Sequence, residues 1–255
     1  VTTTAAISSV AAGGIAVTAS NGDASIGGNL TANTATNAPI VVKSTANVSV
    51  TASKVLQTNG GGIVLWSRSG ATEGGSTVGY ISVGNSAQFI SNGGLITMAG
   101  TSQTTNGIPT GHAYTTSTTA GVQIGTSLLN TDANVIINSS TTGGGGPIFI
   151  SGQQSGTAIG SWGVIIYSGS TINSGTSTVT IDGIANSNTG NAVELDPNGT
   201  TQLLKITSAA PSGTAISITG AESGTPGANG GGRGIGAWGA NLTISATGGG
   251  NISLT

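Results

Sequence analysis

Three carboxylates in the second half of the chain have the spacing that could support chemistry: Asp182, Glu194 and Asp196. They belong to two short segments in which apolar and polar residues alternate, so their apolar neighbours should point into a core: Val179, Ile181, Val193 and Leu195. The carboxylates would then point outward, where they could share one face. Grouped carboxylates can act as general acid and base on a glycosidic bond, or can bind Ca²⁺. This pattern is the basis for the hypothesis of a polysaccharide-degrading enzyme.

A structural interpretation of the same residues is simpler, and we prefer it. Asp196-Pro197-Asn198-Gly199 is typical of a turn, and Asp182 and Glu194 fit solvated strand positions. A groove that cleaves polysaccharides would also be expected to contain Arg, Lys, His or several aromatic residues. We therefore expect no catalytic residue, no metal ion and no cofactor.

Two further patterns each have a chemical interpretation and a non-functional one. His112, the only histidine, lies near Tyr114, and a Ser-His-Asp site would also need a positioned serine, so we interpret it as a loop histidine. Gly234, Gly236 and Gly239 match the dinucleotide-binding spacing. That site requires a helix after the last glycine, whereas 241–244 is typical of a strand, so the match is accidental.

The three tryptophans, Trp66, Trp162 and Trp238, could stack on sugars if they are exposed. Alternatively they pack at corners of the fold with the indole N–H bonded to a carbonyl. Two of them follow similar glycine-containing sequences, so corner packing is the preferred interpretation.

The overall composition restricts the class of protein. Of 255 residues, 36% are hydrophobic, 5% are charged and 46 are glycine, which fits neither a disordered nor a helical chain. Five Lys and Arg residues spread along the chain cannot neutralise a phosphate backbone or anchor the chain electrostatically to a membrane. The apolar runs are far shorter than the roughly 20 residues that span a bilayer. The absence of cysteine leaves packing and backbone hydrogen bonds as the sources of stability.

Short alternating segments recur along the chain and are separated by clusters of Gly, Asn and Ser that favour corners. Helical spacing is absent, so parallel pairing of these segments requires an all-β, right-handed parallel β-helix, or β-solenoid. An antiparallel sandwich or barrel is the alternative. The thirteen predicted strands are 15–18, 48–51, 80–83, 95–98, 122–125, 135–138, 148–151, 164–167, 179–182, 193–196, 216–219, 242–245 and 252–255.

One internal match sets the expected size of a coil. The segments 159–163 and 235–239 are similar and lie 76 positions apart, which would be three coils of about 25 residues each. A single domain over 1–255 would then contain about ten coils. The stretch 101–120 lacks alternation, and we expect it to project as an irregular loop.

The segment 61–100 resembles a known family. It contains Gly61-Gly62-Ile63-Val64-Leu65-Trp66, then Ile81-Ser82-Val83, then 89–97 with the sequence Phe-Ile-Ser-Asn-Gly-Gly-Leu-Ile-Thr. These residues are similar to the repeats of filamentous-haemagglutinin-like and autotransporter-type bacterial exoproteins. The resemblance implies a right-handed parallel β-helix that is secreted to the cell surface, where it serves in adhesion, aggregation or surface filaments.

The ends of the chain suggest how such a protein could assemble. Neither end resembles a cap, and the final segment, Asn251-Ile252-Ser253-Leu254-Thr255, is a good strand, so we expect head-to-tail stacking into an extracellular filament. The alternative is a stalk segment of a giant adhesin that binds host or matrix glycans. The start at Val1 fits a processed secretory product or a piece of a longer chain. An ice-binding solenoid is less favoured, because a Thr-x-Thr in each coil is absent.

Overall fold

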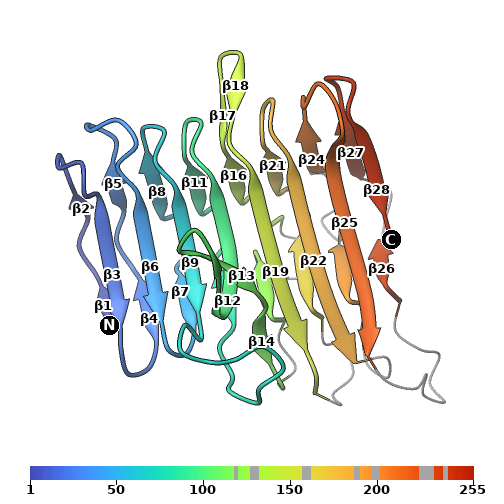
Figure 1. Cartoon of the computed structure of the whole chain (residues 1–255), viewed down its shortest axis with the longest axis horizontal. Coiled ribbons are helices and arrows are strands. Elements are labelled where there is room, and N and C mark those ends of the chain that lie inside the picture. Colours follow the sequence, from blue (N-terminus) through green and yellow to red (C-terminus); the bar gives the residue numbers. More distant parts are fainter. Residues whose placement is uncertain are drawn as a thin grey trace.

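The computed structural model describes residues 1–117, 120–126, 132–156, 162–186, 190–196, 202–223, 233–237 and 241–255. These residues form strands, turns and bends without a helix, and so without any helix long and apolar enough to cross a membrane. The strands make three sheets in which every pair between successive coils is parallel. Figure 1 shows the coils stacked side by side, with the N-terminal coil at one end and the C-terminal coil at the other. The parallel β-helix is therefore confirmed.

Each coil contributes one strand to each sheet, in chain order. The first sheet contains β1 (Thr2–Thr3), β4 (Ala24–Ile26), β7 (Val48–Val50), β10 (Ile81–Val83), β15 (Val122–Ile124), β20 (Val164–Tyr167), β23 (Val193–Asp196) and β26 (Ile235–Ala237). The second contains β2 (Ile7–Ser8), β5 (Leu30–Ala32), β8 (Val55–Thr58), β11 (Gln88–Ile90), β16 (Ile136–Asn138), β21 (Thr171–Asn173), β24 (Leu204–Ser208) and β27 (Leu242–Ala246).

The third sheet has the longest strands and carries the additional elements of the fold. It contains β3 (Ile15–Ala19), β6 (Ile40–Ser44), β9 (Ile63–Ser67), β12 (Ile96–Thr105), β19 (Ile148–Gln154), β22 (Val179–Asn186), β25 (Thr214–Ser223) and β28 (Asn251–Leu254). Also attached to it are β13 (Ile108–Gly111) and β14 (Ala113–Thr115), while β17 (Ser140–Thr141) and β18 (Gly144–Gly145) form a separate small hairpin. All thirteen strands predicted from alternation overlap strands of the structure.

The strands of the described residues form eight coils, fewer than the ten expected. The first repeats are short, because Ile15 pairs with Ile40 and Ile40 pairs with Ile63, which are 25 and 23 residues apart. Later connections are longer, and Ile96 pairs with Ile148, which is 52 residues away. The two segments of the 76-residue match are also not three coils apart. Val193 pairs with Val164 on one side and with Ile235 on the other, so Val164 and Ile235 are two coils apart.

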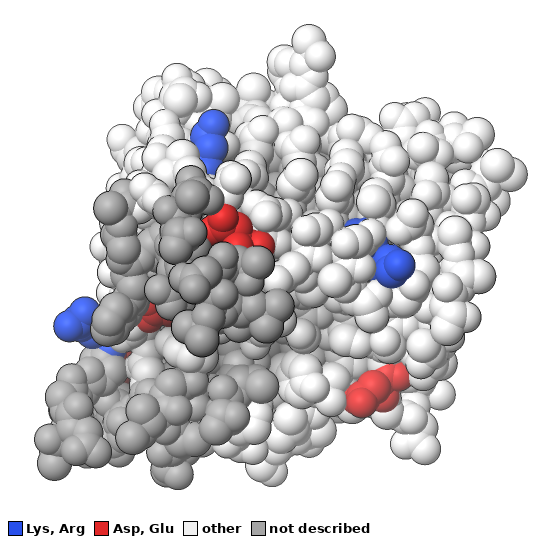
Figure 2. All heavy atoms as spheres, turned by 180° about the vertical axis from the view of Figure 1, so that it is seen from behind, with Lys and Arg blue, Asp and Glu red and all other residues white. Residues whose placement is uncertain are grey.

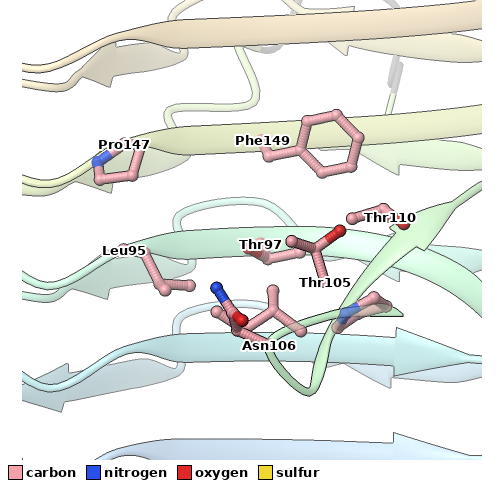
Figure 3. Close-up of a pocket in the computed structure, with 9 residues that line it drawn as sticks. Leu95, Thr97, Thr105, Asn106, Thr110, Pro147 and Phe149 are labelled. Carbon is pink, nitrogen blue, oxygen red and sulfur yellow. The ribbon is translucent and has the colours of Figure 1, made fainter. Parts of the chain in front are cut away.

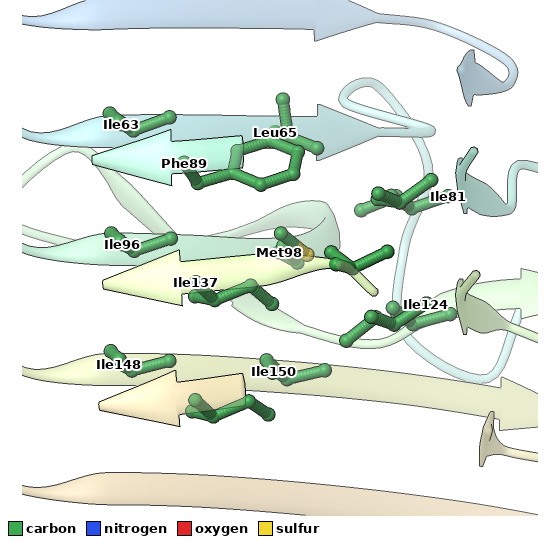
Figure 4. Close-up of a cluster of buried hydrophobic side chains, with 14 of the residues drawn as sticks. Ile63, Leu65, Ile81, Phe89, Ile96, Met98, Ile124, Ile137, Ile148 and Ile150 are labelled. Atoms are coloured by element: carbon green, nitrogen blue, oxygen red, sulfur yellow. The ribbon is translucent and has the colours of Figure 1, made fainter. Parts of the chain in front are cut away.

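The core is built from columns of inward-facing side chains. In the third sheet, Ile63, Ile96 and Ile148 occupy successive coils in register and are at most 1% exposed. Figure 4 shows this column beside a second one of Leu65, Met98 and Ile150. Burying one such side chain contributes about 1.5–3 kcal/mol, so the stacked columns supply the stability that this chain cannot obtain from charges or disulfides.

Buried hydroxyl groups complete the corner between the second and third sheets. Thr58 Oγ1 donates to the carbonyl of Gly61 (2.6 Å), and Ser91 Oγ donates in the same way to the carbonyl of Gly94 (2.5 Å). Ser139 Oγ repeats the pattern in the next coil. Because these carbonyls turn inward at a tight corner, each hydroxyl provides a partner for a backbone group that would otherwise be unsatisfied.

The segment expected to be an irregular loop over 101–120 is ordered wherever it is described. Its first residues continue β12, which folds back on β13 as an antiparallel hairpin with Asn106 and Gly107 at its turn, both at positive φ. β14 then pairs in parallel with the second half of β19, whereas β12 pairs only with its first half. Alternation is absent from its first half because residues 102–107 are all exposed, so no core favours apolar residues at alternate positions there.

Candidate functional site

The three carboxylates singled out from the sequence do not form one group. Asp182 lies on β22 in the third sheet, whereas Glu194 lies on β23 in the first sheet, because the chain turns a corner between them. The side chain of Glu194 is only 3% exposed, rather than solvated as expected, and Asn191 Nδ2 donates a hydrogen bond to its Oε2. Asp196 ends β23, and its side chain lies outside the described residues. Asp182 and Glu194 therefore do not share one outer face, which the enzymatic hypothesis required.

Asp182 is instead linked to Glu73 through the side chain of His112, which lies between the two carboxylates. Nδ1 of His112 lies 3.0 Å from Oε1 of Glu73, and Nε2 lies 3.2 Å from Oδ2 of Asp182. The backbone N–H of His112 donates to Glu73 Oε2 at 3.0 Å, so Glu73 holds the residue through both carboxylate oxygens. His112 lies in the connection between β13 and β14, as the loop interpretation expected, but it also bridges two segments 39 and 70 residues away.

Glu73 is positioned by its own loop, which connects β9 to β10. Arg68 in this loop is fully buried, and its Nη2 donates to the carbonyls of Thr72 (3.1 Å) and Gly75 (2.9 Å). Its guanidinium carbon also lies 4.7 Å from the centre of the Tyr114 ring on β14. The loop is therefore held to β14 through Arg68 and to the end of β13 through Glu73.

The electrostatics of this cluster favour the charged forms of His112 and Glu73. Burial alone would lower the pKa of His112, but its hydrogen bonds to Asp182 and Glu73 outweigh that effect and raise the pKa to about 9. Burial would raise the pKa of Glu73, and the hydrogen bonds from His112 lower it instead. Burial lowers the pKa of Arg68, opposed by the charge of Glu73. Near neutral pH His112 is therefore protonated.

This arrangement is suited to holding segments together. An imidazolium that donates from both nitrogens has no lone pair with which to accept a proton from a nucleophile. Both ring nitrogens of His112 are bonded to carboxylates, so neither is paired with a serine hydroxyl. Among the described residues, no group of three or more His, Cys, Asp or Glu side chains has the arrangement of a metal site.

The tryptophans and glycines are placed as follows. Trp66 lies on the outer face of β9 rather than at a corner, and its Nε1 donates to the carbonyl of Thr101 at 2.6 Å, which ties the base of the hairpin to the sheet. Lys43 Nζ lies 4.0 Å from the centre of the Trp66 ring. Trp162 precedes β20, and Trp238 lies outside the described residues. Gly234 and Gly236 lie before and within strand β26, and Gly239 lies outside the described residues. The next described element is strand β27 and not the helix that a dinucleotide site requires.

Sequence reasoning missed Glu73, Arg68 and Tyr114 as partners of this cluster. Their separations in the chain leave no local pattern to detect. The low charge content was the one available signal. Only 5% of the residues are charged, and any charged side chain that becomes buried needs an opposite charge or a hydrogen-bond partner.

Fold and cluster together define a parallel β-solenoid with a side hairpin clamped to its third sheet. No family model matches the chain, and neither curated proteins nor solved structures gave a significant match.

Proposed function

We propose that this chain is a non-catalytic structural protein of the bacterial cell surface that assembles head to tail into an extracellular filament. The distribution of exposed apolar side chains is the main support. Eight large hydrophobic residues are exposed among the described residues, and five of them belong to the first or last coil: Val1, Ile7, Val10, Ile252 and Leu254. They are 36–75% exposed.

The residues of the last coil are in register with the core. Ile252 pairs with Ile216 and Leu254 pairs with Ile218, and these two partners are fully buried, yet Ile252 and Leu254 are 41% and 53% exposed. The core columns therefore reach the end of the described coils uncovered. Since all three sheets are parallel, the first coil of a second copy presents strands of the same direction to this edge, and stacking would continue every sheet.

The strands of the first and last coils also lack charged side chains, and Arg233 lies just before β26. The segments 1–22 and 234–255 contain no Asp, Glu, Lys, Arg or His. Charged side chains on edge strands normally prevent edge-to-edge association, so their absence removes a barrier to stacking. Figure 2 shows that charges are also few and scattered on one face of the molecule. The resemblance of 61–100 to repeats of bacterial exoproteins supports display outside the cell.

The test uses charges placed on the last strand. We expect the protein to form fibres at raised concentration, visible by electron microscopy and sedimentation, and Ile252→Lys together with Leu254→Lys to abolish them. Ile136→Lys is the control, because Ile136 is 36% exposed but lies on β16 in the middle of the second sheet, away from both ends, and this variant should still polymerise. Wild-type protein that stays monomeric throughout the concentration series would reject the proposal.

The second candidate is a stalk segment, in which further coils of the same polypeptide cover these edges. The same observations support it, because the register and the exposed columns suit a covalent neighbour as well as a second copy. Mass spectrometry of the native protein distinguishes the two. A mature species of this size favours the subunit, and a much longer one favours the stalk.

A further inference from the structure

A cleft of about 250 Å³ lies between the tip of the β12–β13 hairpin and the outer face of the third sheet. Figure 3 shows Leu95, Pro147 and Phe149 on the sheet side, with Asn106 of the hairpin turn facing them. Ile108 completes the hairpin side. The cleft is distinct from the His112 cluster, which lies at the base of the same hairpin.

The wall of the cleft is held in place from both ends of the hairpin. Trp66 bonds to the carbonyl of Thr101 where β12 leaves the sheet, and His112 is clamped where the chain returns. A side wall fixed in this way is preorganised, so a ligand would not have to order it.

The lining combines an apolar floor with an uncharged polar rim. Phe149 on β19 is a partly exposed aromatic ring. The polar groups are the amide of Asn106 and the hydroxyls of Thr97, Thr105 and Thr110, which provide both donors and acceptors. No residue that lines the cleft can ionise, so a charged ligand would lose hydration without gaining an opposite charge.

We propose that this cleft binds one uncharged sugar residue of a glycan. A pyranose presents an apolar C–H face, which fits the ring of Phe149, and a circumference of hydroxyl groups, which fits the rim of threonines and Asn106. The volume is below the roughly 300–1,000 Å³ of pockets that hold drug-sized ligands, which agrees with a single ring. A purely apolar ligand would leave the Asn106 amide and the threonine hydroxyls at the rim without bonding partners. The proposal does not depend on filament assembly.

The experiment is NMR titration of the full chain, with methyl groups of Ile, Leu and Val labelled, using the methyl glycosides of glucose, galactose and N-acetylglucosamine as probes. We expect at least one of them to shift the Leu95 and Ile108 signals with a dissociation constant in the millimolar range. Phe149→Ala should weaken that binding at least tenfold, and Asn106→Ala should weaken it several-fold. Phe149 points away from the core, so its replacement should leave the solenoid signals in place.

Two comparisons complete the test. Ile136→Ala, which removes an exposed apolar side chain from the second sheet, should leave binding unchanged. Methyl glucuronide, which carries a carboxylate, should bind at least fivefold more weakly than methyl glucoside. The proposal is overturned if no neutral glycoside shifts the cleft signals, if the glucuronide binds as well as the neutral sugar, or if the apolar probe benzyl alcohol binds there while the glycosides do not.

Discussion

His112 obtains its partners from two other coils, and this decides its protonation. Glu73 comes from the loop after the third coil and Asp182 from the sixth, while Arg68 is the other cation near Glu73. The side chain of His112 is 13% exposed, so water screens these contacts weakly. At the residue scale the only histidine of the chain therefore behaves as a fixed cation at neutral pH.

The stability of the protein should fall as the pH rises above neutrality. The pKa of His112 is about 9 in the folded chain and 6.5 in the unfolded chain. The stabilisation is therefore complete below about pH 6.5 and disappears as the pH rises through 9, a loss of about 3 kcal/mol. Urea unfolding at a series of pH values measures it, and His112→Gln should flatten the profile between these limits. An unchanged profile in that variant would contradict the assignment.

At the scale of elements, the hairpin is a side structure fastened at a few points. β13 pairs only with β12 among the described strands, and its remaining connections to the solenoid include Trp66 and the His112 clamp. The coils beneath it are held by their own ladders and columns. We therefore expect the hairpin to open locally before the solenoid unfolds.

Glu73→Gln tests this expectation. Removing the charge leaves His112 with one carboxylate, so amide hydrogen exchange should accelerate in β13 and β14. Exchange in β9 and β22 should remain slow. Glu222→Gln, at an exposed position near the end of β25, is the matched control and should change neither region. Equal acceleration throughout the solenoid would show that the clamp stabilises the whole fold instead of the hairpin.

The sequence predicted the elements better than it predicted their connections. Alternation located thirteen strands, but 171–173 contains a single apolar residue and 24–26 combines one isoleucine with a small alanine, so neither produces a clear periodic signal. The coil number was overestimated because alternation contains no information on how much chain lies between strands. Glu194 was expected to be solvated because alternation separates inward from outward but does not show which outward positions another segment covers.

At the scale of the whole molecule, end-to-end association would depend on apolar contact and backbone pairing. The strands of the first and last coils lack charged side chains, so we expect no ion pair between these strands to hold the joint. Raising the NaCl concentration from about 0.05 to 1 M, which shortens the screening length to about 3 Å, should leave fibre length unchanged or increase it. Light scattering follows this directly. Fibres that dissolve with added salt would indicate an electrostatic joint elsewhere on the surface.

The unequal coils have a consequence for how this architecture can change. Coils of 23 and 52 residues add the same axial height, because height is set by the strand spacing of about 4.8 Å. Insertions at the corners therefore enlarge the cross-section of the solenoid or add elements to its surface without changing its axial length. During evolution, such proteins could lengthen or replace the hairpin while the axial length of each subunit stayed the same.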